Sequence, residues 1–216
     1  MTIHKSDQLS KLIVERIEKL QIDYIEKDKA EAAATLAHLR KGINKPVGSI
    51  PEIWMITLEG IPDPSKSDKP SRTEITSHAV LTLYALHQQS KTEPMHIRGV
   101  GVGTAVQELA KRSLSDSDNR DLYVEQPVRR RLNAAATSIS IIELIYHLRG
   151  IITQLRAENI CMDYEQLAKD LYKSQFPNGL DAVRLKWGRD FYQSRSIDKD
   201  TNPNNEVIST SESSDI

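Results

Sequence analysis

The sequence predicts an all-α protein, a compact multi-helix bundle with a disordered C-terminal tail. Three observations support this fold class. Apolar residues recur at spacings of three and four along most of the chain, which is typical of amphipathic helices. No segment shows the alternation of a half-buried strand, and glycines and prolines fall between the helical stretches. We therefore expect one all-α domain over residues 1–197 and a disordered acidic, serine-rich tail over residues 198–216.

The longest apolar pattern covers residues 126–157, and we expect the other helices to pack around it. Its stripe consists of Val128, Leu132, Ala135, Ile139, Ile142, Ile145, Leu148, Ile152 and Leu155, widened by Ile141, Leu144 and Ile151. Pro127 suits a first helical turn. Polar residues interrupt the pattern near Ser138, and Ser140 with Glu143 has the spacing of a capping box. This stretch is therefore two helices that meet near Ser138, or one bent helix.

The N-terminal part predicts three helices. The first, over residues 8–26, is a surface helix. Its apolar face carries Leu9, Leu12, Ile13, Ile17 and Leu20. Asp28 is predicted to cap the alanine-rich second helix, and Gly42 to end it in the left-handed conformation. Residues 51–60 predict a short apolar helix, which Trp54 is expected to anchor to the core.

The middle of the chain alternates loops and helices. Residues 60–71 contain three prolines and many small polar residues, so we expect a loop there. Residues 72–89 form an apolar stretch that is long enough to be a central buried helix. After a glycine-rich turn, residues 104–112 predict another helix, which Thr104 is expected to cap.

The C-terminal part predicts two further helices. Asp163 and Gln166 have the spacing of a capping-box start, so a helix is expected to begin after Asp163. Pro177 and Gly179 break this helix because neither residue suits a helix interior. Residues 180–193 then predict the last helix before the tail.

Composition points to a soluble cytoplasmic protein. The chain is 38% apolar and 27% charged, and no run approaches the about 20 apolar residues that a membrane span requires. The N-terminal residues lack the apolar core of a secretory signal. A single cysteine, Cys161, cannot form an internal disulfide, which agrees with a reducing compartment.

The net charge of −1 conceals an uneven distribution. Residues 198–216 carry five acids against one lysine, a net charge of −4. Residues 120–197 carry twelve Lys and Arg against nine acids, a net charge of +3, and residues 1–119 balance at zero. A near-neutral total argues against nucleic-acid binding, and removing the tail weakens that objection without reversing it.

No catalytic or metal-binding constellation emerges. The GVGVG run at residues 99–103 lacks the Lys-Ser/Thr ending of a phosphate loop and follows no strand, so a flexible turn before a helix is the better interpretation. The six histidines show no HExxH motif, no pair at a spacing of four and no cysteine partner. Cys161 has neither a visible base nor an activating neighbour. We therefore expect no catalytic residue, no metal and no cofactor.

The basic residues remain as candidates for binding phosphate. Arginines on helices are commonly solvated or salt-bridged, which is the alternative to a binding role. Residues 129–131 are three successive arginines, and each turns about 100° from the last on a helix. At most two of the three can therefore serve one surface.

Several motifs occur together in one order along the chain. They are LAHLRKG (36–42), PEIW (51–54), LTLYALHQQS (81–90), MHIRGVGVGTAV (95–106), RRRLNAA (129–135), YHLRGIITQLRAENICMDYEQLAKDLY (146–172) and VRLKWGRDFY (183–192). This combination resembles the CasB family, the small subunit of the type I-E CRISPR Cascade complex. The resemblance covers about residues 10 to 195. The loop at 61–71 and the tail lie outside it.

The resemblance implies an all-α protein without enzymatic activity, a subunit of a surveillance ribonucleoprotein in antiviral defence. It implies that the protein helps to hold the guide RNA–target DNA heteroduplex and the displaced strand. The implied partners are the other Cascade subunits (backbone and large subunits), the CRISPR guide RNA, the target DNA and a second copy of the chain, with no membrane. Because guide pairing reads the sequence, such a subunit needs only backbone contacts.

The motifs also imply which residues contact nucleic acid. They are Arg40, Lys41, Arg130, Arg131, Arg149, Arg184, Lys186 and Arg189. Aromatic residues at Trp54, Trp187, Phe191 and Tyr192 are expected to be core or interface anchors in preference to base-stacking groups. The alternative is a purely structural helical scaffold that bridges other subunits. A continuous arginine surface favours binding, whereas dispersed arginines that pair with acids favour the scaffold.

Overall fold

The computed structural model describes residues 2–112 and 127–197, and within these ranges the chain is all-α, which confirms the predicted fold class. The elements are α1 (Thr2–Gln21), a π-helical turn (Ile22–Glu26), α2 (Ala30–Lys41), a 3-10 turn (Pro51–Ile53), α3 (Trp54–Leu58), α4 (Arg72–His87), α5 (Val102–Arg112), α7 (Pro127–Thr137), α8 (Ile141–Ala157), α9 (Tyr164–Ser174) and α10 (Gly179–Ile197). The predicted tail, residues 198–216, lies outside the described residues.

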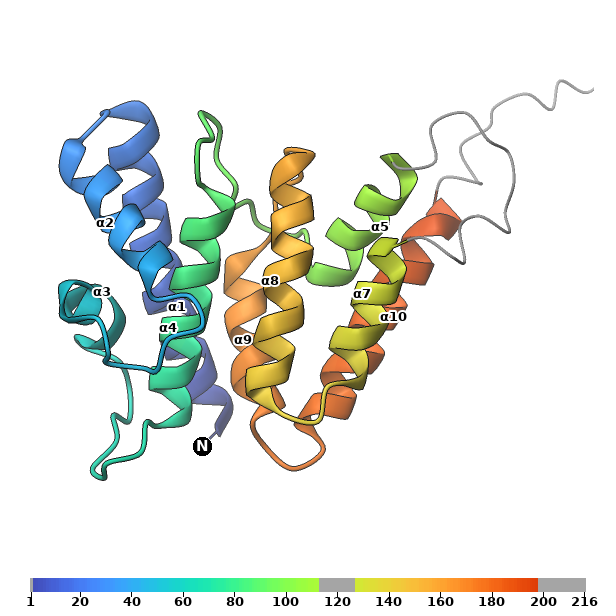
Figure 1. The fold of residues 1–216 in the computed structure, drawn as a ribbon. Coiled ribbons are helices and arrows are strands. Elements are labelled where there is room, and N and C mark those ends of the chain that lie inside the picture. The colour runs from blue at the N-terminus through green and yellow to red at the C-terminus, as the bar shows by residue number, and fades with distance from the viewer. Residues whose placement is uncertain (1, 113–126, 198–216) are drawn as a thin grey trace, which may run out of the picture.

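Helix α4 forms the centre of the molecule. It packs against α1, α2, α3, α8 and α9, and nearly all of its length is buried. Figure 1 shows α2 and α3 at one end of the molecule and α5, α7 and α10 at the other. The expectation that residues 126–157 form the centre is therefore wrong. A helix that is buried on all sides carries no amphipathic stripe, so α4 gave the weaker periodic signal.

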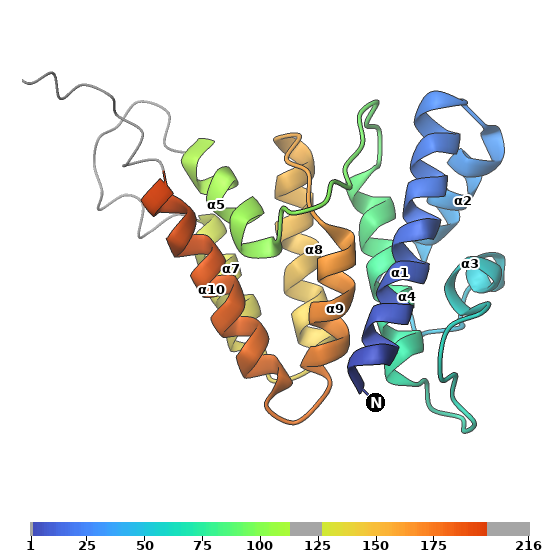
Figure 2. The same cartoon turned by 180° about the vertical axis from the view of Figure 1, so that it is seen from behind.

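The other helices form two sides around α4. Helices α7 and α8 lie on one side (Figure 1), and α1, α9 and α10 on the other (Figure 2). Helix α1 packs on α9, and α5 packs on α10. The predicted apolar face of α1 is confirmed, because Leu9, Ile13 and Ile17 are fully buried. None of the helices in the described ranges has the length and apolarity that crossing a membrane requires.

Both ends of α2 differ from the prediction. Asp28 does not cap the helix: it has a positive φ of 45°, and Lys29 occupies the N-cap position without a side-chain hydrogen bond. Gly42 ends the helix with a φ of −74°, outside the left-handed region. A Cβ on Gly42 would lie 3.0 Å from Ile53 Cδ1 and 3.1 Å from Thr82 Cγ2. The glycine therefore permits close packing and is not required by a left-handed backbone.

The anchor of α3 also differs from the prediction. Trp54 is 47% exposed, whereas its neighbour Ile53 is 1% exposed and belongs to the core. The 3-10 turn before α3 changes the helical phase, so the residue that faces the core is the one before the tryptophan. The Trp54 Nε1–H donates to the Gly48 carbonyl oxygen at 2.8 Å, which holds the indole against the preceding loop.

Helix α5 begins at Val102, so Thr104 lies inside the helix and is not its cap as predicted. The close approach of α5 to α10 explains the glycine at position 103. A Cβ there would overlap the Trp187 carbonyl oxygen and lie 2.7 Å from Asp190 Cβ. Gly103 therefore lets two helix backbones pack in contact.

The predicted break near Ser138 is confirmed, because α7 ends at Thr137 and α8 begins at Ile141. Ser140 Oγ accepts a hydrogen bond from the Glu143 backbone N–H at 3.2 Å. The predicted stripe is partly wrong, since Ile139 and Ile142 are 91% and 78% exposed. The rest of the prediction for α8 is confirmed, because Leu148, Ile152 and Leu155 of the stripe are buried, together with Leu144 and Ile151 of the widened set.

Side-chain caps fix the starts of α9 and α4. Asp163 Oδ1 accepts from the Gln166 backbone N–H at 3.0 Å, which confirms the predicted cap of α9. A capping box that was not predicted begins α4: Ser71 Oγ accepts from the Glu74 N–H, and Glu74 Oε2 accepts from the Ser71 N–H at 2.6 Å. Such caps each contribute about 1 kcal/mol.

Candidate nucleic-acid interface

One side of α8 is exposed along most of its length. At about 100° per residue, Ile142, Tyr146, Arg149, Thr153 and Arg156 fall within an arc of about 80°. Ile142 and Tyr146 are 78% and 63% exposed, Arg149 and Thr153 are exposed, and Arg156 is half-buried. We call these five residues the α8 ridge. The ridge lies opposite the apolar residues that attach α8 to the core.

Helix α7 places an arginine beside the middle of the α8 ridge. Arg131 is exposed, and a Cβ built on Gly150 would lie 2.5 Å from its Nη1 atom. The guanidinium of Arg131 therefore lies against α8 at Gly150, the residue after Arg149. Neither arginine side chain forms a hydrogen bond or an ion pair with any residue in the described ranges. The packed helices α7 and α8 thus each present an exposed arginine side chain.

A second pair of arginines lies toward the C-terminal end of the ridge. Arg156 Nη1 donates to Gln89 Oε1 at 2.6 Å, so a neutral amide at the end of α4 orients it. Burial lowers the pKa of Arg40, and repulsion by the charge of Arg156 lowers it further. Arg40, at the C-terminal end of α2, is thus close enough to Arg156 for their charges to repel.

The remaining predicted contacts divide into two groups. Lys41 and Arg130 are exposed on the same helices as Arg40 and Arg131, and Arg189 is exposed on α10. Helix α10 packs against α5 and α9, on the side seen in Figure 2. Arg131 and Arg149 therefore lie on the packed helices α7 and α8, and Arg40 lies near Arg156, while Arg189 lies on α10.

Arg184 and Lys186 have structural contacts with acids. Arg184 Nη1 lies 2.8 Å from Asp181 Oδ1, and Nη2 donates to the Ser138 carbonyl oxygen in the turn between α7 and α8. Lys186 Nζ lies 2.9 Å from Asp170 Oδ2, which also accepts from Trp187 Nε1–H at 2.8 Å. Both side chains fasten α10 to its neighbours, and their nucleic-acid contacts stay a prediction.

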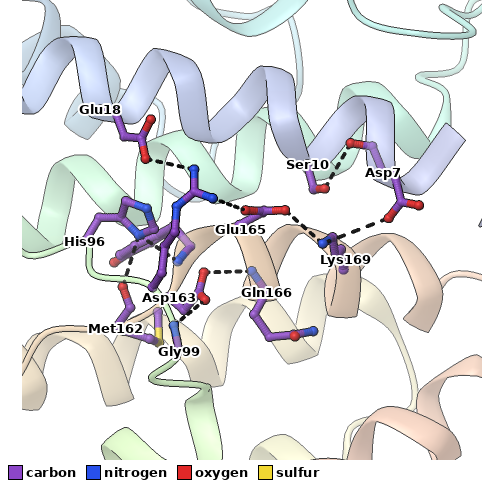
Figure 3. Close-up of polar contacts among 12 residues, drawn as sticks. Asp7, Ser10, Glu18, His96, Gly99, Met162, Asp163, Glu165, Gln166 and Lys169 are labelled. Carbon is purple, nitrogen blue, oxygen red and sulfur yellow. Dashed lines mark hydrogen bonds and ion pairs between the residues drawn. The ribbon is translucent and has the colours of Figure 1, made fainter. Parts of the chain in front are cut away.

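The glycine-rich segment before α5 is pinned by charged groups, as Figure 3 shows. Asp163 Oδ2 accepts from the Gly99 N–H at 2.8 Å. Arg98 lies 3.1 Å from Glu18 and 3.7 Å from Glu165, so it links α1 to α9. The arginine of the MHIRGVGVG motif is thus occupied by two acids, and an Asp side chain already binds the backbone amide that a phosphate would need.

Three histidines are buried in the core as neutral, structural groups. His87 Nδ1 lies 3.0 Å from the Tyr164 hydroxyl, and His96 Nδ1 accepts from the Tyr164 N–H at 3.2 Å. Burial lowers the pKa of His78 and His96, and lowers that of His87 to about 4. Residues 2–112 and 127–197 contain no group of three His, Cys, Asp or Glu side chains that could hold a metal.

The one cysteine is not an activated nucleophile. The Cys161 thiol donates to the Pro94 carbonyl oxygen at 3.2 Å, and burial raises its pKa. Trp187 and Phe191 are each 1% exposed, so the prediction that they are core anchors is confirmed. Tyr192, by contrast, is 51% exposed.

Tyr146 is a candidate that the sequence interpretation missed. It is 63% exposed on the α8 ridge, three residues before Arg149. Its ring makes an edge contact with His147, with centroids 5.4 Å apart. The sequence after the Ser140 cap could have indicated this residue. If Leu144, Leu148 and Ile151 face the core, helical spacing puts Tyr146 on the exposed side.

Comparisons with known proteins agree with this architecture. A family profile described as CRISPR-associated protein Cse2 matches residues 35–192. The structure is similar to the crystal structure of CasB from Thermobifida fusca, with a TM-score of 0.69 and 33% sequence identity, over 86% of this chain and 98% of that chain. No curated protein matches the chain. The profile match extends from α2 to α10 and includes α8 with all five ridge residues. On these findings the chain belongs to the Cse2 (CasB) family of CRISPR-associated proteins.

Proposed function

We propose that this protein is a non-catalytic subunit of a type I-E Cascade ribonucleoprotein in the cytoplasm. In this role it contacts the guide RNA–target DNA heteroduplex and the displaced strand, and so stabilises the R-loop. The observation that carries the proposal is that α7 and α8 pack together and each present an arginine, with Arg131 Nη1 lying against Gly150, the residue after Arg149. Both side chains are exposed and lack an acidic partner in the described ranges.

Phosphate contact suits this arrangement. Arginine offers planar donors to phosphate oxygens and stays charged. Arg149 and Arg156 are seven residues apart on α8, which is about 10 Å along the helix axis. A nucleic-acid strand carries a charge about every 3.4 Å of helix rise, so the ridge spans several phosphates. R-loop formation is a nearly balanced exchange, so a few such contacts can shift it.

A purely structural scaffold is the second candidate, and specific contacts favour it for part of the surface. Arg98, Arg184 and Lys186 pair with acids and join helices. Exposed Ile142 on the ridge is also suited to a protein contact. The two candidates differ in what the ridge arginines do. A scaffold loses assembly when they are reversed, whereas a nucleic-acid-binding subunit keeps assembly and loses affinity for the strands.

The first test measures binding of short single strands, duplexes and RNA–DNA heteroduplexes to the purified protein at two salt concentrations. We expect weak, sequence-independent binding that falls with salt and is lost in an Arg131→Glu/Arg149→Glu variant. A Lys11→Glu/Lys173→Glu variant is the matched control, since it changes the charge equally on exposed positions of α1 and α9. An equal loss in the control would mean that net charge, not the ridge, determines binding.

The second test uses the assembled complex. We expect the Arg131→Glu/Arg149→Glu subunit to enter the complex normally and to lower R-loop formation on target DNA. If the complex lacks this variant subunit, the ridge is a protein contact and the scaffold is the correct function. Unchanged R-loop formation with the variant incorporated would also contradict the proposal.

A further inference from the structure

A groove of about 720 Å³ lies between α1, α2 and α3, at the end of the molecule far from α7 (Figure 1). Its apolar lining comes from Leu20, Ala32, Met55 and Ile56. Leu20 and Ala32 are buried at its base, whereas Met55 is 76% exposed. Exposed apolar side chains beside a concave surface are typical of interaction sites. The groove is therefore a candidate for a contact that the α8 ridge does not make.

Helix α3, which presents Met55, is held in a fixed position. Arg16 of α1 donates to the Ile56 carbonyl oxygen at 2.7 Å and to the Glu59 carbonyl oxygen. From the other side, the Ser77 hydroxyl of α4 donates to the Thr57 carbonyl oxygen at 2.7 Å. Two helices thus fix a five-residue helix, so the groove is formed before any partner binds. Preformed surfaces lose less entropy on binding.

The acidic side chains of the groove lie on α2 and at the ends of α3. Glu31 on α2 and Glu52 beside α3 have carboxylates that pair with no residue in the described ranges, and Glu59 completes this acidic side. Lys29 lies 2.9 Å from Asp23, so these two charges balance, whereas Arg16 binds neutral carbonyl oxygens and keeps its charge. Among the lining residues, this leaves Arg16 and Lys19 against three carboxylates, an excess of one negative charge.

We infer that this groove docks a segment of another Cascade subunit in which an apolar side chain is flanked by lysine or arginine. The apolar side chain packs against Met55 and the groove base, and the basic residues meet Glu31 and Glu52. Unpaired acids favour a basic occupant, and they repel a nucleic-acid strand. The inference rests on the proposed function, since the partner belongs to the same assembly, but it uses a surface that is separate from the α8 ridge.

The test places a photo-crosslinking amino acid at position 55 of the subunit in the assembled complex. Mass spectrometry then identifies the crosslinked residue. We expect a crosslink to another subunit, in a segment with a basic residue within two positions of an apolar one. A crosslink to a second copy of this chain or to the guide RNA would overturn the inference, and so would the absence of any crosslink.

Substitutions give an independent readout. We expect Met55→Ser and Glu31→Lys/Glu52→Lys each to weaken incorporation into the complex by about tenfold, because interface anchors commonly contribute 1–2 kcal/mol. Leu185→Ser, an equally apolar change at a 54% exposed position on α10, is the control and should incorporate normally. Normal incorporation of the groove variants would contradict the docking site.

The groove and the ridge fail in different ways. Arg131→Glu/Arg149→Glu removes nucleic-acid affinity and keeps incorporation if the proposed function holds. The groove variants keep the nucleic-acid affinity of the purified protein and lose incorporation if the docking site holds. If only the arginine variant departs from its expected result, the proposed function is contradicted. If only the groove variants depart from theirs, the docking site is contradicted.

Discussion

The guanidinium of Arg131 on α7 occupies the space that a side chain at Gly150 of α8 would fill. The missing side chain lets the end of the arginine contact the neighbouring helix at the residue after Arg149. A glycine in a helix interior costs about 0.5–1 kcal/mol relative to alanine, so this position trades helix stability for the placement of a charge.

Replacing Gly150 by alanine is therefore expected to raise stability and lower binding. The added Cβ moves only the flexible end of Arg131, and alanine gains about 0.5–1 kcal/mol in unfolding free energy, measured by chemical denaturation. Affinity for single strands should fall a few-fold because Arg131 leaves its place. In an Arg131→Ala background, Gly150→Ala should cause no further loss of affinity. A destabilised Gly150→Ala protein would mean that the contact is part of the core.

Stability should depend on pH through the buried histidines. The pKa of His87 is about 4 in the folded protein, below its ordinary value of about 6.5 in the unfolded chain. The unfolded state therefore binds the proton more readily, and stability is lost as the pH falls from about 6.5 to about 4. One such group contributes up to about 3 kcal/mol over that range. Burial lowers the pKa of His78 and His96 in the same direction.

Denaturation curves between pH 7 and pH 4 test this dependence. A His87→Gln variant can keep a polar contact with the Tyr164 hydroxyl but has no group that titrates in this range. Its stability at pH 7 is expected to be lower, and its loss of stability on acidification smaller than that of the wild type. Equal slopes for both proteins would show that His87 is not responsible.

The positions of the helices could be predicted from the sequence more fully than the side of each helix that is buried. Spacing and caps identified the break near Ser138 and the start of α9 at Asp163, because these signals are local. The stripe of α8 was predicted correctly at Leu148, Ile152 and Leu155 and wrongly at Ile142, which is exposed in the first turn after the break. Trp54 was assigned to the core because large aromatics are usually buried, but the 3-10 turn before it gave that place to Ile53.

The site was harder to predict because ion pairing depends on residues that are distant in sequence. Arg98 pairs with Glu18, 80 positions away, and Lys186 pairs with Asp170, 16 positions away. No local pattern indicates these partners. The sequence consequently could not separate the arginines that join helices from Arg131 and Arg149. Neither of these two side chains pairs with an acid in the described ranges.

Lys186 offers a test of this separation. Asp170 is almost fully buried and accepts from Lys186 Nζ and Trp187 Nε1. Removing the carboxylate in Asp170→Ala leaves the indole N–H without an acceptor, so we expect a loss of about 2–4 kcal/mol in unfolding free energy. Lys186→Met should destabilise the protein less, because its Nζ is partly solvated.

Binding measurements on the folded Lys186→Met protein then decide the role of the lysine. If Lys186 contacts nucleic acid as its motif predicts, the affinity of this variant for heteroduplex falls as much as that of Arg149→Met, at temperatures well below the melting point. Unchanged affinity would contradict this contact and leave Lys186 only the ion pair that joins α10 to α9.

Tyr146 provides the last prediction, because its exposed ring lies on the ridge next to Arg149. An aromatic side chain beside arginines is how many proteins hold single strands, and stacking contributes about 1–3 kcal/mol per base. We expect Tyr146→Ala to weaken single-strand binding by that amount, Tyr146→Phe to retain it, and duplex binding to change little. Tyr192→Ala, at a 51% exposed ring on α10, is the control. Equal losses for single strands and duplexes would show that Tyr146 does not stack on bases.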